Sequence, residues 1–162
     1  MRGRKLWMSD TPDERSDHLG FVYEVDKRGA QHVLVNGLGL GMVIAALVRV
    51  PSVQRVDVCD IDPDVVALVG PHVTALGSEW GVDVRVALGD AHTPNDTWGR
   101  GTRWDAAWHD IWLTISADNY EDHKAMRRTY GRRVGFQDVW GDWETRRQVR
   151  RDKELERVWG WS

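Results

Sequence analysis

The sequence predicts an α/β fold built on a doubly wound, mostly parallel sheet of about four strands, with helical extensions at both ends. Three observations lead to this prediction. Strand-like and helix-like segments alternate between residues 31 and 112, three glycines separate the first pair, and an Asp-Pro step opens the second helix. Strands separated by helices pair in parallel through right-handed crossovers.

The predicted core consists of strands and helices in regular alternation. In order along the chain they are a strand at 31–36, a helix at 42–50, a strand at 54–60, a helix at 62–69, and strands at 82–90 and 103–112. Asp62 suits the cap of the second helix, and Pro63 suits its first position. Because proline lacks the backbone N–H that a helix interior needs, Gly70-Pro71 is expected to kink or break this helix.

The two ends of the chain are expected to be helical. Residues 1–30 form an N-terminal extension, 31–115 the ligand-binding core, and 116–162 a C-terminal helical segment of the same domain. The C-terminal segment divides into a helix at 119–133, the stretch VGFQDVW that fits either a strand or a loop, and a helix at 142–159.

Composition narrows the function classes. The chain has 162 residues, 22 Lys and Arg against 25 Asp and Glu, and a formal net charge of -3. This balance does not predict binding to nucleic acid or to an anionic membrane. The first residues are too polar for a signal peptide, no apolar run approaches the ~20 residues that span a membrane, and Cys59 is the single cysteine. A cytoplasmic protein is therefore expected.

The chain is rich in tryptophan, with 10 in all. Trp140, Trp143, Trp159 and Trp161 gather near the C-terminus. Because tryptophan in a small domain favours cores and interfaces, a homodimer through this segment is one expectation.

The stretch VLVNGLGLG carries the first candidate site. Gly37, Gly39 and Gly41 stand between a predicted strand and a predicted helix, where bare backbone and free helical N–H groups can meet a ligand. A tight turn without a ligand is the alternative. Asp60, which ends the next strand, stands where an acidic residue accepts hydrogen bonds from ribose hydroxyls. Met42 replaces the third glycine of the dinucleotide fingerprint, so a nucleoside without a pyrophosphate fits better.

Four segments together resemble a known family. VLVNGLGLG, VDVCDIDPDVVAL, VRVALGDA and RWDAAWHDIW occur in the order and spacing of the S-adenosylmethionine-binding core of Rossmann-like (class I) methyltransferases. Within that superfamily the chain looks most like the spermidine-synthase-like branch, because an acidic-Ile-Asp run ends the second strand. The resemblance covers residues 31–112 and implies S-adenosylmethionine as the cofactor.

The resemblance also implies a role for individual residues. The three glycines would pass under the methionine and ribose, with Asn36 beside the amino-acid part of the ligand. Asp60 would hold the ribose hydroxyls and Ile61 would lie against the adenine. Asp90 would accept from the adenine amine and Ala91 would donate to a ring nitrogen. A turn residue is the alternative for Asp90.

The chain departs from the family pattern in three places. Asn36 and Leu40 stand where the family carries an acidic residue, so the ammonium group of the ligand lacks a charged partner there. Asp110 is followed by IWLTIS and not by the Ser/Thr-Asp-Pro run of aminopropyltransferases. The family sheet continues with three more strands, whereas this chain ends with two predicted helices. The last two departures argue against true spermidine synthesis.

A small methyltransferase with an unidentified acceptor is the function expected from these features, and no metal is expected. The sulfonium is already activated, so the protein mainly aligns the reactants. Asp110 would face the sulfonium and the acceptor, and Asp110 or His109 would serve as the base where a proton must leave. Trp112 and Tyr120 are candidate walls for the acceptor, while core packing is the better interpretation of Trp108.

Other functions stay open. The chain could bind S-adenosylmethionine or its demethylated product without catalysis and act through partners, or it could be an aminopropyltransferase-like enzyme. Nucleic acid is not the favoured partner. The basic runs MRRTYGRR and ETRRQVRR are suited to phosphates, but acidic residues interrupt the second run and fit a solvated helix better.

Overall fold

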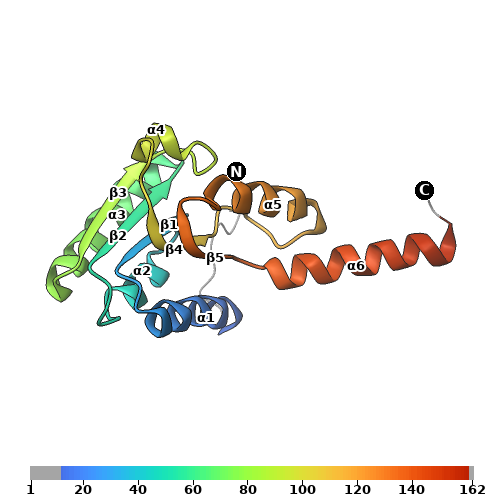
Figure 1. Cartoon of the computed structure of the whole chain (residues 1–162), viewed down its shortest axis with the longest axis horizontal. Coiled ribbons are helices and arrows are strands. Elements are labelled where there is room, and N and C mark those ends of the chain that lie inside the picture. Colours follow the sequence, from blue (N-terminus) through green and yellow to red (C-terminus); the bar gives the residue numbers. More distant parts are fainter. Residues whose placement is uncertain (1–11, 161–162) are drawn as a thin grey trace, which may run out of the picture.

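The computed structural model describes residues 12–160, so the first residues of the predicted N-terminal extension and Trp161 lie outside the described part, as does the side chain of Trp159. It contains a five-stranded, all-parallel sheet in the order β3-β2-β1-β4-β5 (Figure 1). The strands are β1 (His32–Asn36), β2 (Arg55–Asp60), β3 (Asp83–Leu88), β4 (Trp104–His109) and β5 (Val134–Val139). The doubly wound α/β prediction is confirmed.

The sheet has one strand more than the four expected. The segment that fitted either a strand or a loop forms β5, which pairs in parallel with β4. The sequence leaves it ambiguous because Gly135, Gln137 and Asp138 interrupt its apolar residues, and β5 is only half-buried along most of its length. An edge strand needs less apolar surface than a central one.

Six helices and one short 3-10 turn accompany the strands in the described residues. They are α1 (Pro12–Arg28), α2 (Met42–Leu47), α3 (Pro63–Trp80), α4 (Pro94–Trp98), η1 (Ala117–Asn119), α5 (Tyr120–Tyr130) and α6 (Asp142–Trp159). Among residues 12–160, no helix combines the length and the apolar character needed to cross a bilayer.

Helix α3 is longer than the sequence predicts. The expected start is confirmed, since Asp62 accepts hydrogen bonds from Asp64 N at 2.8 Å and Val65 N at 3.4 Å. The expected break at Pro71 is wrong, because the helix continues to Trp80. The later turns pack on the sheet, with Gly77 lying close against Val84 of β3. This packing offsets the hydrogen bond that a proline inside a helix forfeits.

The core lies on both faces of the sheet. Because strand side chains alternate, Val33 and Trp108 point to one face and Leu34 to the other. Phe21 and Val25 of α1 are fully buried on the first face, so the N-terminal helix is part of the main core. Helix α5 covers the second face through Met126 and Tyr130.

Helix α6 differs from every other long element. Figure 1 shows it running away from the rest of the molecule, with only its beginning close to the sheet. Every residue from 150 to 158 is exposed. Trp143, Leu155 and Val158 are large apolar residues that α6 leaves in solvent.

Candidate functional site

A cavity of about 500 Å³ opens at the carboxyl ends of the first four strands. Parallel pairing brings these ends together, with Asn36 opposite both Cys59 and His109. The cavity is lined by Gly37, Gly39, Cys59, Asp60, Ile61, Asp62, Val65, Gly89, Asp90, Ala91, His92, Asp110, Ile111, Trp112 and Leu113. Its size is that of a small-molecule site. Most of the predicted site residues meet on its walls.

The glycine turn between β1 and α2 forms one wall of this cavity. Gly37 has φ 99°, and a Cβ there would collide with the carbonyl oxygen of Asp110. Gly41 has φ 79°, and a Cβ there would lie 2.6 Å from Val73 Cγ1 of α3. Both glycines are therefore required by a tight turn and close packing, while Gly37 and Gly39 also border the open cavity.

Asp60 joins the two turns that follow β1 and β2. Its Oδ2 accepts a hydrogen bond from Leu38 N at 2.8 Å, and its Oδ1 accepts one from Asp62 N at 2.9 Å. A carboxylate offers roughly four acceptor positions, so two remain after these bonds. Asp60 thus fixes the shape of the wall and keeps acceptor capacity toward the cavity that it lines.

The loop after β3 forms another wall of the cavity. Asp90 Oδ1 accepts from His92 N at 2.8 Å and lies 2.9 Å from His92 Nδ1. These backbone and side-chain hydrogen bonds hold the pKa of Asp90 below its usual value. Ile61 also lines the cavity and is 70% exposed, so an apolar side chain borders the cavity without a protein partner that buries it.

Four predicted site residues do not line this cavity: Asn36, Gly41, His109 and Tyr120. Asn36 and His109 are both fully buried, and Asn36 Nδ2 donates to His109 Nδ1 over 2.9 Å. His109 Nε2 therefore carries the proton and donates to Gln137 Oε1 at 3.1 Å. Burial lowers the pKa of His109 to about 4. Both side chains lie on the face of the sheet that α5 covers, so neither lines the first cavity.

Asp110 lines the cavity. The histidine that it contacts is not His109, its neighbour in the sequence, but His18. His18 Nε2 of α1 lies 3.6 Å from Asp110 Oδ2. His18 also meets Trp108 edge to face, with ring centroids 5.5 Å apart. Sequence reasoning missed His18 because nothing in a polar N-terminal helix marks which residue reaches a strand end far along the chain.

Trp112 lines the cavity and is held by α5. Its Nε1 donates to Asp122 Oδ2 at 2.8 Å, and its ring lies 4.3 Å from that of His123. Tyr120 does not line this cavity; Lys124 Nζ lies 5.0 Å from its ring centroid. Of the two aromatic residues expected to form acceptor walls, only Trp112 is in place.

A second cavity of about 560 Å³ lies where β5 meets α6. It is lined by Trp108, Asp138, Val139, Gly141, Asp142, Trp143, Glu144 and Arg146. None of these residues belongs to the predicted site, and the sequence assigns Trp108 to the core. Burial raises the pKa of Asp138 there.

Two observations on the described residues concern metal ligands and the reactivity of the thiol. No group of three or more His, Cys, Asp or Glu side chains between residues 12 and 160 is placed to hold a metal ion. Cys59 lines the first cavity, but burial raises the pKa of its thiol to about 11. A thiol with that pKa is almost wholly protonated at neutral pH and is a poor nucleophile.

Solved structures of methyltransferases share this fold. An O-methyltransferase from Bacillus cereus in complex with SAH has a TM-score of 0.53 and 13% identity, covering 77% of this chain and 54% of that one. The SAH-bound methyltransferase PaMTH1 from Podospora anserina gives 0.54 and 14%, covering 76% and 51%. The methyltransferase domain of bacterial CtHen1 gives 0.57 and 15%, covering 76% and 62%.

These comparisons show the fold: the chain shares the Rossmann-like α/β fold of these three structures, and its own sheet has five parallel strands. It spans about half to three-fifths of the length of the three structures. No protein-family model and no curated protein sequence matches the chain.

Proposed function

We propose that the first cavity binds S-adenosylmethionine and that the protein is a methyltransferase with an acceptor still to be identified. One observation carries the proposal. The glycine turn, Asp60, Ile61 and Asp90 come from separate parts of the chain, each was assigned to an adenosyl ligand from the sequence, and all line one cavity. Two of the structures with the same fold contain SAH.

The residues present fit an adenosyl group. Asp60 keeps acceptor positions for the ribose hydroxyls, and a charged hydrogen bond of this kind is worth about 1.5–3 kcal/mol. Ile61 offers the adenine an exposed apolar surface, and burial of such a side chain contributes about 1.5–3 kcal/mol. Asp90 binds His92 through Oδ1, which leaves Oδ2 for the adenine amine.

The reaction end of the cavity is formed by Asp110 and Trp112. Bound S-adenosylmethionine would supply an activated methyl group, so the chain's own task is alignment. Asp110 lies against the glycine turn, where its carboxylate can hold an acceptor or take its proton. The indole of Trp112 can close the wall beside it, and its orientation is fixed by Asp122. We do not assign His109 to this end, because it is fully buried and does not line the cavity.

Calorimetric titration tests the cofactor. The protein should bind S-adenosylmethionine and SAH, and it should not bind NAD. Asp60→Ala should abolish the binding of SAH, whereas Asp83→Ala, which removes an exposed carboxylate at the far end of β3, should leave it unchanged. Failure of every adenosyl compound to bind would reject the proposal.

The same titration separates the alternatives. Preference for decarboxylated S-adenosylmethionine would favour an aminopropyltransferase. The spermidine-synthase-like branch stays a prediction, because none of the three compared structures is named as a polyamine synthase. Slow formation of SAH from S-adenosylmethionine without an added acceptor would favour a transferase. Tight binding with no turnover would favour a module that binds the cofactor and acts through partners.

Helix α6 favours a second role, and we infer that it pairs with α6 of a second copy. Its apolar residues Trp143, Leu155 and Val158 are 61%, 50% and 63% exposed in the described chain. Four arginines stand between residues 146 and 151, and three acidic residues stand between 152 and 156. Antiparallel pairing of two copies would place the arginines of one helix opposite the acids of the other.

The charge pattern of α6 gives less support to nucleic acid. Arg146 is paired with Asp142 at 2.8 Å, so part of the basic surface is already neutralised.

Light scattering tests directly whether two copies pair through α6. A dimer that dissociates as salt is added would support it, and a monomer at every concentration would contradict it. Binding of DNA or RNA that weakens steeply with salt would instead favour phosphate contacts.

A further inference from the structure

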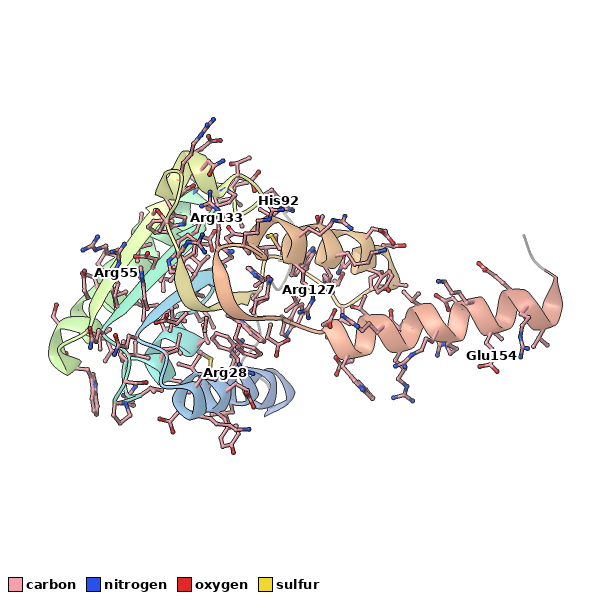
Figure 2. The ribbon with its side chains drawn as sticks, in the orientation of Figure 1. Arg28, Arg55, His92, Arg127, Arg133 and Glu154 are labelled. Carbon is pink, nitrogen blue, oxygen red and sulfur yellow. The ribbon has the colours of Figure 1, made fainter. Side chains whose placement is uncertain are left out.

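His92 faces a carboxylate on each side at the rim of the first cavity. Its Nδ1 lies 2.9 Å from Asp90 Oδ1, and its Nε2 lies 3.0 Å from Asp122 Oδ1. Figure 2 labels His92 beside α5, the helix that carries Asp122. Neither the sequence nor the proposed reaction gives this histidine a function, although it lines the cavity.

The protonation state of His92 determines how many of these contacts are hydrogen bonds. A neutral imidazole has one N–H, so it can donate to only one of the two carboxylates; the protonated ring donates to both. Partial burial opposes the charged form, but the hydrogen bonds to Asp90 and Asp122 outweigh it and raise the pKa of His92. Asp90 and Asp122 are the charged groups that face His92 within the described residues.

The two carboxylates are connected to two different walls of the cavity. Asp90 belongs to the wall assigned to the adenine, and its position is set by His92. Asp122 holds Trp112, which belongs to the wall assigned to the acceptor. The last residue of α5 makes a separate contact, since Tyr130 donates to the carbonyl of Ala91 at 2.7 Å. Helix α5 is therefore tied to the β3 loop at its end by Tyr130 and near its start by His92.

We propose that His92 is a positioning residue that, when protonated, ties Asp122 and Trp112 to Asp90 and so draws the two walls of the cavity together around the cofactor. This step rests on the proposed cofactor site. His92 acts through its neighbours and does not touch the reacting atoms. The three side chains are 44%, 45% and 39% exposed, so solvent screens the pairs. Such pairs are worth about 0.2–1 kcal/mol, which corresponds to roughly a 1.4-fold to fivefold change in affinity.

Nuclear magnetic resonance of the free protein tests the link without any ligand. The His92 ring protons, assigned with His92→Asn, should titrate above the ordinary histidine value, and Asp122→Asn should lower that midpoint. The indole N–H of Trp112, assigned with Trp112→Phe, should shift with the same midpoint and lose this shift in His92→Asn. A Trp112 signal that ignores pH, or a His92 midpoint at or below the ordinary value, would overturn the proposal.

Affinity for SAH tests the consequence. Between about pH 6 and pH 8 the wild-type protein should lose roughly threefold in affinity as His92 gives up its proton. His92→Asn should bind more weakly near pH 6 and show no such dependence. His72→Asn, an exposed histidine of α3 outside the cavity, should behave as wild type. A wild-type affinity that does not change with pH would contradict the proposal, whereas no binding at any pH would reject the cofactor site itself.

Discussion

The strands of residues 31–112 and helix α6 differ in what surrounds them. Val33, Leu34 and Val35 of β1 are fully buried, and the loops after β1 to β4 share one cavity. Helix α6 is 18 residues long, yet residues 150 to 158 are all exposed. An isolated helix shorter than about 12–15 residues is marginal in water, so most helices depend on tertiary packing. The comparison shows that β1 buries its apolar side chains within the described chain, whereas α6 leaves large apolar side chains in solvent.

The contact between Gly37 and Asp110 is the most sensitive point of the cavity region. Gly37→Ala should lower the free energy of unfolding by more than about 3 kcal/mol and abolish SAH binding, because the new Cβ would occupy the place of a backbone oxygen. Urea denaturation checks the first effect and calorimetry the second.

Gly81→Ala is the matched control for this substitution. Gly81 also has a positive φ, of 71°. Apart from its two chain neighbours, however, no residue has an atom within 4 Å of the place that its methyl group would take. The substitution should cost only about 1–2 kcal/mol, which is the strain of the left-handed backbone alone. Equal losses for the two variants would show that the approach of Gly37 to β4 does not matter.

Burial of His109 should make the stability of the cavity region depend on pH. The pKa is about 4 in the folded protein and about 6.5 in the unfolded chain, so only the unfolded chain binds the proton between these values. The free energy of unfolding should therefore fall, by on the order of 3 kcal/mol, as pH drops from about 6.5 to about 4. His109→Gln should reduce this slope in urea titrations, and an unchanged slope would show that His109 is not kept neutral.

Substitution of Ile61 should have a smaller effect, which changes the affinity for SAH but not the free energy of unfolding. Ile61→Ala should weaken SAH binding about tenfold, because the adenine loses an apolar surface. Since Ile61 is 70% exposed, the free energy of unfolding should change by no more than about 0.5 kcal/mol. Leu68→Ala, at a 72% exposed position of α3, is the control and should affect neither quantity. Equal affinity of Ile61→Ala and Leu68→Ala for SAH would show that the adenine does not lie against Ile61.

The smallest effect is expected in α6. Leu155→Ala should leave both SAH affinity and the stability of the diluted protein within about 0.5 kcal/mol of wild type. It should weaken the dimer, because Leu155 is half-exposed in one copy and would be covered in two. Loss of SAH binding in this variant would show that the two regions are coupled and not separate.

The same contrast explains what could be predicted from sequence. The alternation of β-branched runs with helical segments predicts the sheet, since local pattern and burial agree in β1, β2 and β4. Helix α3 was predicted too short, because the effect of Pro71 is local whereas the packing of Gly77 on Val84 is tertiary. Strand β5 was ambiguous because an edge strand carries polar residues.

The candidate site shows a similar limit. Gly37, Asp60, Ile61 and Asp90 could be assigned to the site because each lies at a strand end or within two residues of it. The direction of Asn36 and His109 was not predicted, since a residue at the end of a strand can face either side of the sheet. His18 and His92 were missed because their partners, Asp110 and Asp122, lie far from them along the chain.

A crystal structure of the protein grown with SAH would locate the ligand. We expect an adenosyl group across the ends of β1 to β4, with the ribose on Asp60 and the adenine between Ile61 and Ala91. Ligand density anywhere else, or a first cavity that stays empty at saturating SAH, would contradict it.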